Sequence, residues 1–272
     1  MKQNRPRFHT RTGLAEDIAR LGCVPGDMVM VHAAVSKVGP LVNGPDALIG
    51  ALLDAVSPGG TVVAYTDWDA LYDELADAEG RFLPEWRDHV PPFDPAASRA
   101  VRDHGVLPEF LRTWPGARRS GNPGASVAAI GAKAEWITAD HPLDYGYGEG
   151  SPFAKLTASG GKVAMIGAPL DTMSLLHHAE HLARIPHKRI RRYEVPFATA
   201  QGTLWRMVEE FDTAVPVVPG LADDYFGEIV SAFLESGRGV RGLVGQAESC
   251  VVDAAEITRF AVRWLEERCG ST

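Results

Sequence analysis

Three of the chain's nine histidines lie within the eight residues from Ser174 to His181, whose sequence is SLLHHAEH. From His177 the stretch reads H-x-x-E-H, a pattern in which two histidines hold zinc and the glutamate acts as base. On a helix, His177 and His181 lie one turn apart on one face, with Glu180 close to that face. A catalytic zinc also needs a third protein ligand. A zinc site, a histidine general base and a solvated helix face all remain open, and the base is favoured because imidazole titrates near neutral pH.

Two further stretches suit phosphate groups. The turn from His32 to Gly39, HAAVSKVG, follows an apolar run and precedes a predicted helix, where backbone N–H groups gather. Its spacing matches neither a Walker loop nor a dinucleotide fingerprint, so by spacing alone an ordinary loop explains it better. The segment from Gly116 to Pro123, GARRSGNP, offers guanidinium groups that match phosphate oxygens, although in isolation a solvated basic turn explains it better.

One segment is strongly acidic. From Asp67 to Glu79 the chain reads DWDALYDELADAE, with six acids and no basic residue. Carboxylates pair with ammonium groups and aromatic faces attract cations, so Asp67, Trp68 and Asp69 suit an amine-rich ligand as well as they suit a solvated loop. The stretch DYGYGEGSP offers a second acidic and aromatic wall through Tyr147 and Glu149.

The elements that must position these residues alternate between helix and strand patterns. Capping residues, apolar runs and glycine or proline boundaries predict the elements. Predicted helices are Thr12–Leu21, Pro45–Val56, a helix over SLLHHAEH capped by Asp171 or Thr172, and a final helix that Asp253 opens and that runs through Glu267; predicted strands are Met28–His32, Thr61–Tyr65 and Lys162–Ile166, with a hairpin of Arg191–Phe197 and Thr203–Val208. Interleaved helices and strands predict an α/β fold with a mixed sheet.

The region from Asp67 to Asp103 has little periodicity and several prolines. Long irregular segments in compact domains are usually functional loops or linkers. Its aromatic residues argue against disorder, because disordered chains are poor in aromatics. We therefore expect a long ordered loop over a site.

Composition narrows the class of protein. The chain has 272 residues, of which 45% are hydrophobic and 23% charged, and a formal net charge of −8. An acidic balance disfavours nucleic acid and is compatible with a cationic small molecule. The N-terminus has no apolar signal region, no apolar run spans a bilayer, and three scattered cysteines form no disulfide framework, so a cytoplasmic protein of one domain, 1–272, is expected.

Eight stretches, in order along nearly the whole chain, resemble the aminoglycoside 3-N-acetyltransferases of the antibiotic N-acetyltransferase family. They are VHAAVSKVGPL, SPGGTVVAYTDWD, PPFDPAAS, PGARRSGNP, GYGEGSP, SLLHHAEH, EEFDT and VGQAES. The resemblance implies a mixed α/β fold distinct from the GNAT fold, acetyl-coenzyme A (acetyl-CoA) as cosubstrate, no metal, and resistance through acetylation of an aminoglycoside 3-amine. A monomer or a homodimer is expected.

The resemblance also implies site residues. The family's L-H-x-A-E motif falls on Leu176 to Glu180 and makes His177 the catalytic histidine, with Glu180 beside it. It implies coenzyme A contacts at His32, Ala34, Val35, Ser36, Lys37, Val38, Gly39, Arg119 and Ser120. We expect the acceptor to lie in an acidic, aromatic cleft of Asp67, Trp68, Asp69, Tyr147, Glu149 and Asp212.

Three positions depart from the family pattern. Asn122 stands where histidine is usual, Ala34 where serine is usual, and Asp67 where relatives often carry a small residue. Asparagine forms hydrogen bonds but does not relay a proton. Acetylation of another amine, a zinc hydrolase using His177 and His181, and a non-catalytic binder are the alternatives to direct acetyl transfer with His177 as base.

Overall fold

The computed structural model describes residues 7–68 and 74–270 of the chain. Within these residues, seven strands form one sheet in the order β3-β4-β2-β1-β5-β9-β8, and two strands form a separate hairpin. The central strand β1 runs parallel to β2 and β5, whereas the outer pairs are antiparallel. The predicted α/β fold with a mixed sheet is therefore confirmed. The strands are β1 (Met28–Ala33), β2 (Thr61–Tyr65), β3 (Arg118–Arg119), β4 (Val127–Gly131), β5 (Lys162–Ile166), β6 (Ile190–Thr199), β7 (Gly202–Phe211), β8 (Val240–Val244) and β9 (Ala247–Asp253).

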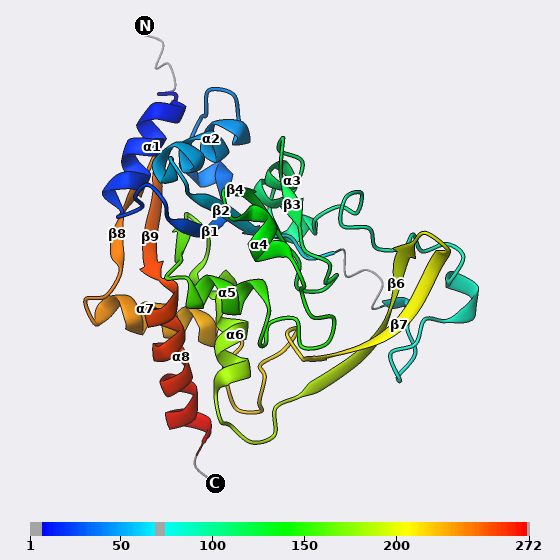
Figure 1. Ribbon diagram of the computed structural model, residues 1–272. Helices are drawn as coiled ribbons and strands as arrows, with labels where there is room; N and C mark the ends of the chain where they lie inside the picture. Colours follow the sequence, from blue (N-terminus) through cyan, green and yellow to red (C-terminus); the bar gives the residue numbers. More distant parts are fainter. Residues whose placement is uncertain (1–6, 69–73, 271–272) are drawn as a thin grey trace, which may run out of the picture.

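Helices cover both faces of the sheet (Figure 1). One face packs against α1 (Arg11–Arg20), α2 (Pro45–Val56) and α3 (Leu107–Arg112). The other packs against α4 (Ala134–Thr138), α5 (Pro152–Ala158), α6 (Leu175–Leu182), α7 (Tyr225–Glu235) and α8 (Ala254–Cys269). Short 3₁₀ helices are η1 (Val35–Val38), η3 (Pro84–Trp86), η4 (Arg102–His104) and η5 (Leu170–Thr172). None of the helices in the described ranges has the length and apolar character that a membrane crossing requires.

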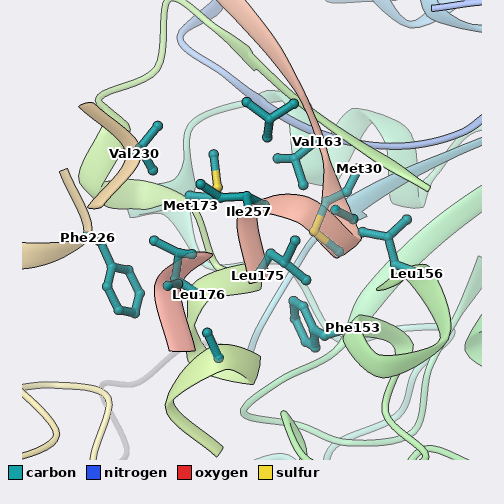
Figure 2. Packing of buried hydrophobic residues seen from close by; sticks show 14 of the residues in the cluster. Met30, Phe153, Leu156, Val163, Met173, Leu175, Leu176, Phe226, Val230 and Ile257 are labelled. Carbon is teal, nitrogen blue, oxygen red and sulfur yellow. The ribbon is translucent and has the colours of Figure 1, made fainter. Parts of the chain in front are cut away.

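Strand β1 divides the core into its two halves. Side chains of a strand alternate between faces, so Val29 and Val31 pack with α1 and α2, whereas Met28 and Met30 pack with α5 and α6. Figure 2 shows Met30 and the α6 leucines among the side chains of this second cluster. His32 is the next residue on the Met30 face. The alternation therefore turns His32 toward the side of the sheet that carries α6.

The strand order places a crevice at the end of β1. The chain moves from β1 to β2 on one side, and later adds β5 on the other side. In open α/β sheets, ligands bind beyond the carboxyl ends of the parallel strands where the order reverses in this way. Residues that follow β1, β2 and β5 therefore meet at one place in the fold.

Local sequence signals account for most of the elements. Helix α2 has the predicted bounds, with Pro45 in its first turn, and strands β2 and β5 also match the prediction. Asp253 accepts a hydrogen bond from the backbone of Glu256 at 2.8 Å and opens α8 as expected. The predicted cap of α6 is wrong, because Asp171 and Thr172 belong to η5 and the helix starts after Ser174 without a side-chain cap.

The segment after β2 lies along the β6–β7 hairpin, which extends away from the sheet (Figure 1). Phe93 forms a bridge with Phe197 of β6, and the rings of Phe82 and Trp205 lie 4.9 Å apart. Glu194 accepts a hydrogen bond from the guanidinium of Arg87. These contacts hold the described part of the predicted loop, residues 74–103, in an ordered arrangement.

Candidate active site

A cavity of about 390 Å³ lies at the carboxyl end of the parallel strands. We call it the strand-end cavity. It is lined by residues from the ends of β1 and β2, from the segment after β5, from η4 and from α6, among them His32, Ala34, Tyr65, Asp67, His104, Tyr147, Ala168 and His177. The topology thus brings two of the predicted site segments, HAAVSKVG and SLLHHAEH, to one cavity.

His177 is oriented by a buried carboxylate. Its Nδ1 lies 2.6 Å from Oε2 of Glu180, one turn further along α6. An ionised carboxylate only accepts hydrogen bonds, so Nδ1–H of His177 donates and Nε2 carries the lone pair. The ring is packed between the rings of Tyr147 and Phe226, each 4.8 Å away. His177 therefore presents a fixed proton acceptor beside the cavity.

Glu180 itself is fully supported from a second helix. It is 2% exposed, and its other oxygen, Oε1, accepts a hydrogen bond from the hydroxyl of Tyr225 at the start of α7. Burial beside this carboxylate raises the pKa of Tyr225 well above its ordinary value, which keeps the hydroxyl a donor. Each oxygen of Glu180 is thus engaged by one side-chain donor. Tyr225, Glu180 and His177 thus form a chain of hydrogen bonds that ends at the cavity.

Tyr147 separates the strand-end cavity from a second cavity. Its hydroxyl lies 2.6 Å from that of Tyr65, and both hydroxyls lie within hydrogen-bonding distance of the carbonyl of Gly124, at 3.0 and 3.1 Å. His178, buried on α6, donates from Nδ1 to the carbonyl of Tyr147 at 2.7 Å. His178, the residue after His177, thus has a separate role: it fixes the loop that carries Tyr147.

Two further histidines line the strand-end cavity. Burial, together with repulsion from His104, lowers the pKa of His32 to about 3, and burial lowers the pKa of His104 to about 4. Both imidazoles are therefore neutral near pH 7. Nε2 of His32 is buried and has no hydrogen-bond partner among the described residues. His104 packs against Tyr65, with ring centroids 4.7 Å apart.

The second cavity has a volume of about 180 Å³ and lies between the hairpin and the segment after β2. We call it the hairpin cavity. Asp67, Tyr147 and Thr213 line both cavities, so the two adjoin. Trp68 and Glu210 also line the hairpin cavity, as do aromatic and cationic side chains of β6, including Tyr193 and Arg191. The hairpin cavity is thus an acidic and aromatic cleft beside the cavity that holds His177, and its carboxylates include Asp67 and Glu210.

The structure separates the predicted acceptor-binding residues. Asp67, Trp68 and Tyr147 line the hairpin cavity. Glu149 is exposed and lines neither the strand-end nor the hairpin cavity. Asp212 accepts a hydrogen bond from the backbone of Ala214 at 3.0 Å in the turn after β7. Asp69 lies outside the described residues. The geometry therefore favours the first three residues, and gives Glu149 and Asp212 no place in the cleft.

His177 and His181 face different carboxylates. Nε2 of His181 lies 2.8 Å from Oε1 of Glu210 on β7, whereas His177 pairs with Glu180. Across the described ranges, no group of three or more histidine, cysteine, aspartate or glutamate side chains has a metal-binding arrangement. The two histidines of the H-x-x-E-H pattern therefore do not point toward one common site.

The turn after β1 serves two cavities. His32 and Ala34 line the strand-end cavity, whereas Ser36 and Lys37 line a third cavity of about 780 Å³ beside β9. We call this the β9 cavity; Ala168 lines it as well as the strand-end cavity, and Arg241 is a second cation in its wall. Cationic side chains and a backbone turn are the donor set that phosphate groups require.

Three other residues of this turn support its structure and line none of the three cavities named above. Val35 packs against the core, and Val38 is fully buried in it. Gly39 has a φ of 96°, and a Cβ there would meet the side chain of Gln246 at 2.7 Å. The carbonyl of Val38 accepts a hydrogen bond from the backbone of Gln246 at 3.0 Å. The turn is therefore clamped by the loop between β8 and β9, which keeps Ser36 and Lys37 in place.

Comparisons with known proteins identify the family of this chain. A family model described as aminoglycoside 3-N-acetyltransferase matches residues 30–266. The chain belongs to this family. An aminoglycoside N(3)-acetyltransferase III of Pseudomonas aeruginosa is 44% identical over 265 residues, which cover 97% of this chain and 96% of the relative. An aminoglycoside N(3)-acetyltransferase VIII of Streptomyces fradiae is 42% identical over 272 residues, covering 96% and 93%.

Solved structures of aminoglycoside acetyltransferases share the fold. A structure described as AAC-IIIb in a binary complex with CoASH has a TM-score of 0.96 and 68% identity, and the match covers 98% of this chain and 99% of that one. AAC-VIa bound to sisomicin has a TM-score of 0.92 and 35% identity, with 97% and 100% covered. The chain is therefore an acetyltransferase with the fold expected from the sequence.

In this acetyltransferase, Arg119 and Ser120 lie behind the cavities. Nε of Arg119 donates to Ser126 at 3.1 Å, and its two terminal nitrogens donate to the carbonyls of Ser98 and Asp67. Ser120 is fully buried, and its hydroxyl lies 2.8 Å from Nδ1 of His141. Neither residue lines the strand-end, hairpin or β9 cavity. The geometry favours supporting roles over direct contact with coenzyme A.

Asn122 has a structural role at the position where the acetyltransferase family usually has histidine. Its amide nitrogen donates to the carbonyls of Pro142 at 2.7 Å and Leu143 at 3.2 Å, and its oxygen accepts from the backbone of Ala125 at 2.9 Å. It is 3% exposed. Asn122 thus ties the segment that leads to Tyr147 to the one that follows β3.

Four residues of this acetyltransferase site were missed from the sequence: Tyr65, His104, Glu210 and Tyr225. Tyr225 and Glu210 meet α6 from positions 45 and 29 residues away in the chain. No local pattern distinguishes these two side chains from their neighbours. EEFDT did flag the region of Glu210, but strand alternation alone does not say which of its acids faces the cleft.

Proposed function

We propose that this enzyme transfers the acetyl group of acetyl-CoA to the 3-amino group of an aminoglycoside, with His177 as general base, and that it thereby confers resistance. The observation that carries the proposal is the chain from Tyr225 through Glu180 to His177, which ends where donor and acceptor cavities adjoin. Family membership and solved relatives with CoASH or sisomicin support the choice of the two substrates.

The donor is assigned to the strand-end and β9 cavities. Lys37 and Arg241 in the β9 cavity suit the phosphate groups of coenzyme A, and Ala168 joins this cavity to the one that holds His177. The thioester end then lies among His32, Ala34 and His177. When bound, acetyl-CoA supplies an activated acyl group. The residues of this chain bind and orient it and handle the proton.

The acceptor is assigned to the hairpin cavity. Aminoglycosides are polycations, and the cavity carries Asp67 and Glu210 with the aromatic faces of Trp68 and Tyr147. Carboxylates and aromatic faces both attract ammonium groups. Because Tyr147 and Asp67 also line the strand-end cavity, an amine held here lies next to His177.

The chemistry requires a base. An ammonium group is not a nucleophile, because its nitrogen lone pair is occupied, so the target amine must be neutral when it attacks the acetyl carbonyl. After the ammonium has lost one proton to solvent, the neutral nitrogen bonds to the acetyl carbon and Nε2 of His177 accepts the proton that this nitrogen then loses. The carbon–sulfur bond of the thioester breaks, and His177 passes that proton to the departing thiolate. Glu180 stabilises the imidazolium form in between and holds the ring, as the third member of a catalytic triad does.

The transfer is direct. Cys23 is buried in the core and its pKa is raised by burial to about 11, and Cys250, also buried, has a raised pKa. Cys250 lines the β9 cavity, but none of the three cysteines lines the strand-end cavity, to which the thioester end is assigned. A thiol nucleophile must be ionised and accessible, so these cysteines do not suit an acetyl-enzyme intermediate.

The proposed reaction is tested by thiol release from acetyl-CoA with the purified wild-type enzyme and a panel of aminoglycosides. We expect turnover with aminoglycosides that carry a 3-amine, and a product whose added acetyl group NMR places on that nitrogen. A 3-deamino analogue of a good substrate is the matched control and must give no turnover. Equal turnover with the analogue, or none with any aminoglycoside, would contradict the proposal.

The donor site is tested by Lys37→Ala. We expect the KM for acetyl-CoA to rise by roughly tenfold with little change in the aminoglycoside KM, because a charge-assisted bond to phosphate is lost. Lys133→Ala, away from the three cavities, is the matched control. An unchanged KM for acetyl-CoA in Lys37→Ala would place the phosphates elsewhere.

A further inference from the structure

Glu210 and His181 form a polar pair that the acetyl-transfer chain does not use. His181 completes the H-x-x-E-H pattern on α6, and Glu210 lies near the end of β7. Each side chain is about one-tenth exposed. A carboxylate held this deep costs free energy unless it is paired. The arrangement of its partners therefore indicates what the carboxylate is oriented for.

Both protein donors engage the same oxygen of Glu210. Nε2–H of His181 and the backbone N–H of Phe211 each lie 2.8 Å from Oε1. Neither of these bonds involves Oε2. In the described residues, Oε2 is not one of the polar atoms that are buried without a partner. Glu210 also lines the hairpin cavity. The carboxylate is thus anchored through one oxygen and keeps its second for the cavity.

Aromatic rings fix the position of His181. The ring of Phe211 lies 4.5 Å from it and that of Tyr145 lies 5.7 Å away, edge-on. Nearby, Nζ of Lys188 donates to the carbonyl of His181 at 3.2 Å, so this ammonium is engaged by the helix backbone. The two donors that bond to Glu210 are therefore an imidazole N–H and a backbone amide. A bound cation would be a third partner, and the first of the three that is an ammonium group.

Glu210 lies near the boundary of the two cavities. Its charge, together with that of Asp67, raises the pKa of Tyr147, after the larger effect of burial. Tyr147 lines both cavities and packs on His177. Glu210 on β7 and Asp67 after β2 thus both act on Tyr147, and each is a carboxylate in the wall of the hairpin cavity that a polycation would enter.

We propose that Glu210 is a specificity-determining residue that binds an ammonium group of the acceptor through Oε2, and that His181 is the positioning residue that holds Oε1. The ammonium bound here is one that is not acetylated, because the target nitrogen must reach His177 in its neutral form. The inference rests on the proposed function, since it names a contact of that reaction's acceptor. It replaces Asp212 and Glu149 as the acidic contacts expected from the sequence.

The test is Glu210→Gln, which keeps the shape of the side chain and its acceptor oxygen but removes the charge. We expect the aminoglycoside KM to rise by roughly 10–100-fold, the acetyl-CoA KM to stay within about twofold, and kcat to fall only a few-fold. Glu209→Gln is the matched control, because Glu209 is the preceding carboxylate and lines neither cavity. Calorimetric binding of the aminoglycoside without acetyl-CoA must weaken in parallel.

His181 is tested by two variants. We expect His181→Ala to raise the aminoglycoside KM by roughly 3–10-fold, and His181→Gln, which can donate from the same position, to restore most of the affinity. Equal unfolding temperatures in the three proteins would show that the effect is not structural.

Failure of the inference is distinct from failure of the proposed function. If the wild type turns over aminoglycosides but Glu210→Gln leaves their KM and calorimetric Kd unchanged, Glu210 does not bind the acceptor. If Glu210→Gln raises the KM of acetyl-CoA to the same extent, the pair belongs to the donor site instead. If the wild type neither turns over nor binds any aminoglycoside, the proposed function itself fails.

Discussion

At the scale of residues, one histidine stretch contains three different roles. His177 pairs with Glu180, His178 holds the carbonyl of Tyr147, and His181 pairs with Glu210. Helical spacing predicts the first pairing, because positions three apart share a face. The other two partners come from a loop and a strand that are distant in sequence. The sequence could therefore suggest a base and its carboxylate, but not the role of the two remaining histidines.

We predict that Glu180→Gln lowers kcat by roughly 10²–10⁴-fold with a small change in KM, because His177 loses its charged partner and its fixed tautomer. Steady-state thiol release measures this directly. Tyr225→Phe, which removes only the hydroxyl bonded to Glu180, is expected to lower kcat by roughly 3–30-fold. A Glu180→Gln enzyme with wild-type kcat would show that His177 acts without this carboxylate.

At the scale of elements, α6 is the part that carries the site, and leucines hold it to the sheet. Leu175 and Leu176 are fully buried in the cluster that also contains side chains of β1, α5, α7 and α8, and the same helix exposes Leu182 at its end. The apolar spacing over SLLHHAEH predicts this helix. Its first turn was not predictable from capping residues, because η5 and Ser174 lead into it without a side-chain cap.

We predict that Leu176→Ala lowers the free energy of unfolding by about 2–5 kcal/mol, because it leaves a cavity in the core. Leu182→Ala is the matched control and should change it by less than about 0.5 kcal/mol, since that side chain is half exposed. Urea unfolding of the three proteins checks both values. Similar losses in the two variants would mean that the burial of α6 differs from this arrangement.

Also at this scale, the strands that were predicted share a common property. Strands β1, β2 and β5 are short buried apolar runs bounded by turn residues, and their length and flanking residues favour strand over helix. Strands β4 and β9 were not predicted, although they are also buried, because alanine, serine and cysteine weaken their pattern. The order of the strands, which creates the crevice, depends on long-range pairing and is not contained in any local pattern.

At the scale of the whole molecule, several histidines are buried in neutral form. The pKa values of His32, His104 and His141 are lowered to about 3, about 4 and about 4, in each case chiefly by burial. In the unfolded chain a histidine has a pKa of about 6.5. Between about pH 6.5 and about pH 4 the unfolded chain therefore binds more protons than the folded one, and stability falls as the pH falls.

We predict that the unfolding temperature drops steadily from about pH 7 to about pH 5, and that His141→Asn makes this drop shallower, because one buried neutral histidine is removed. Thermal unfolding at a series of pH values gives both slopes. His89→Ala, a change at an exposed loop histidine, should keep the wild-type slope. An unfolding temperature that does not depend on pH over this range would contradict the neutral burial of these histidines.

The proposed acetyl transfer depends on His177 as its general base. The most direct measurement is kcat for thiol release by His177→Ala beside the wild type, at saturating acetyl-CoA and aminoglycoside, with His89→Ala as a folded control. We expect kcat to fall by roughly 10²–10⁴-fold in His177→Ala while aminoglycoside binding and the unfolding temperature are retained. A His177→Ala enzyme that turns over at a rate near that of the wild type would contradict the account.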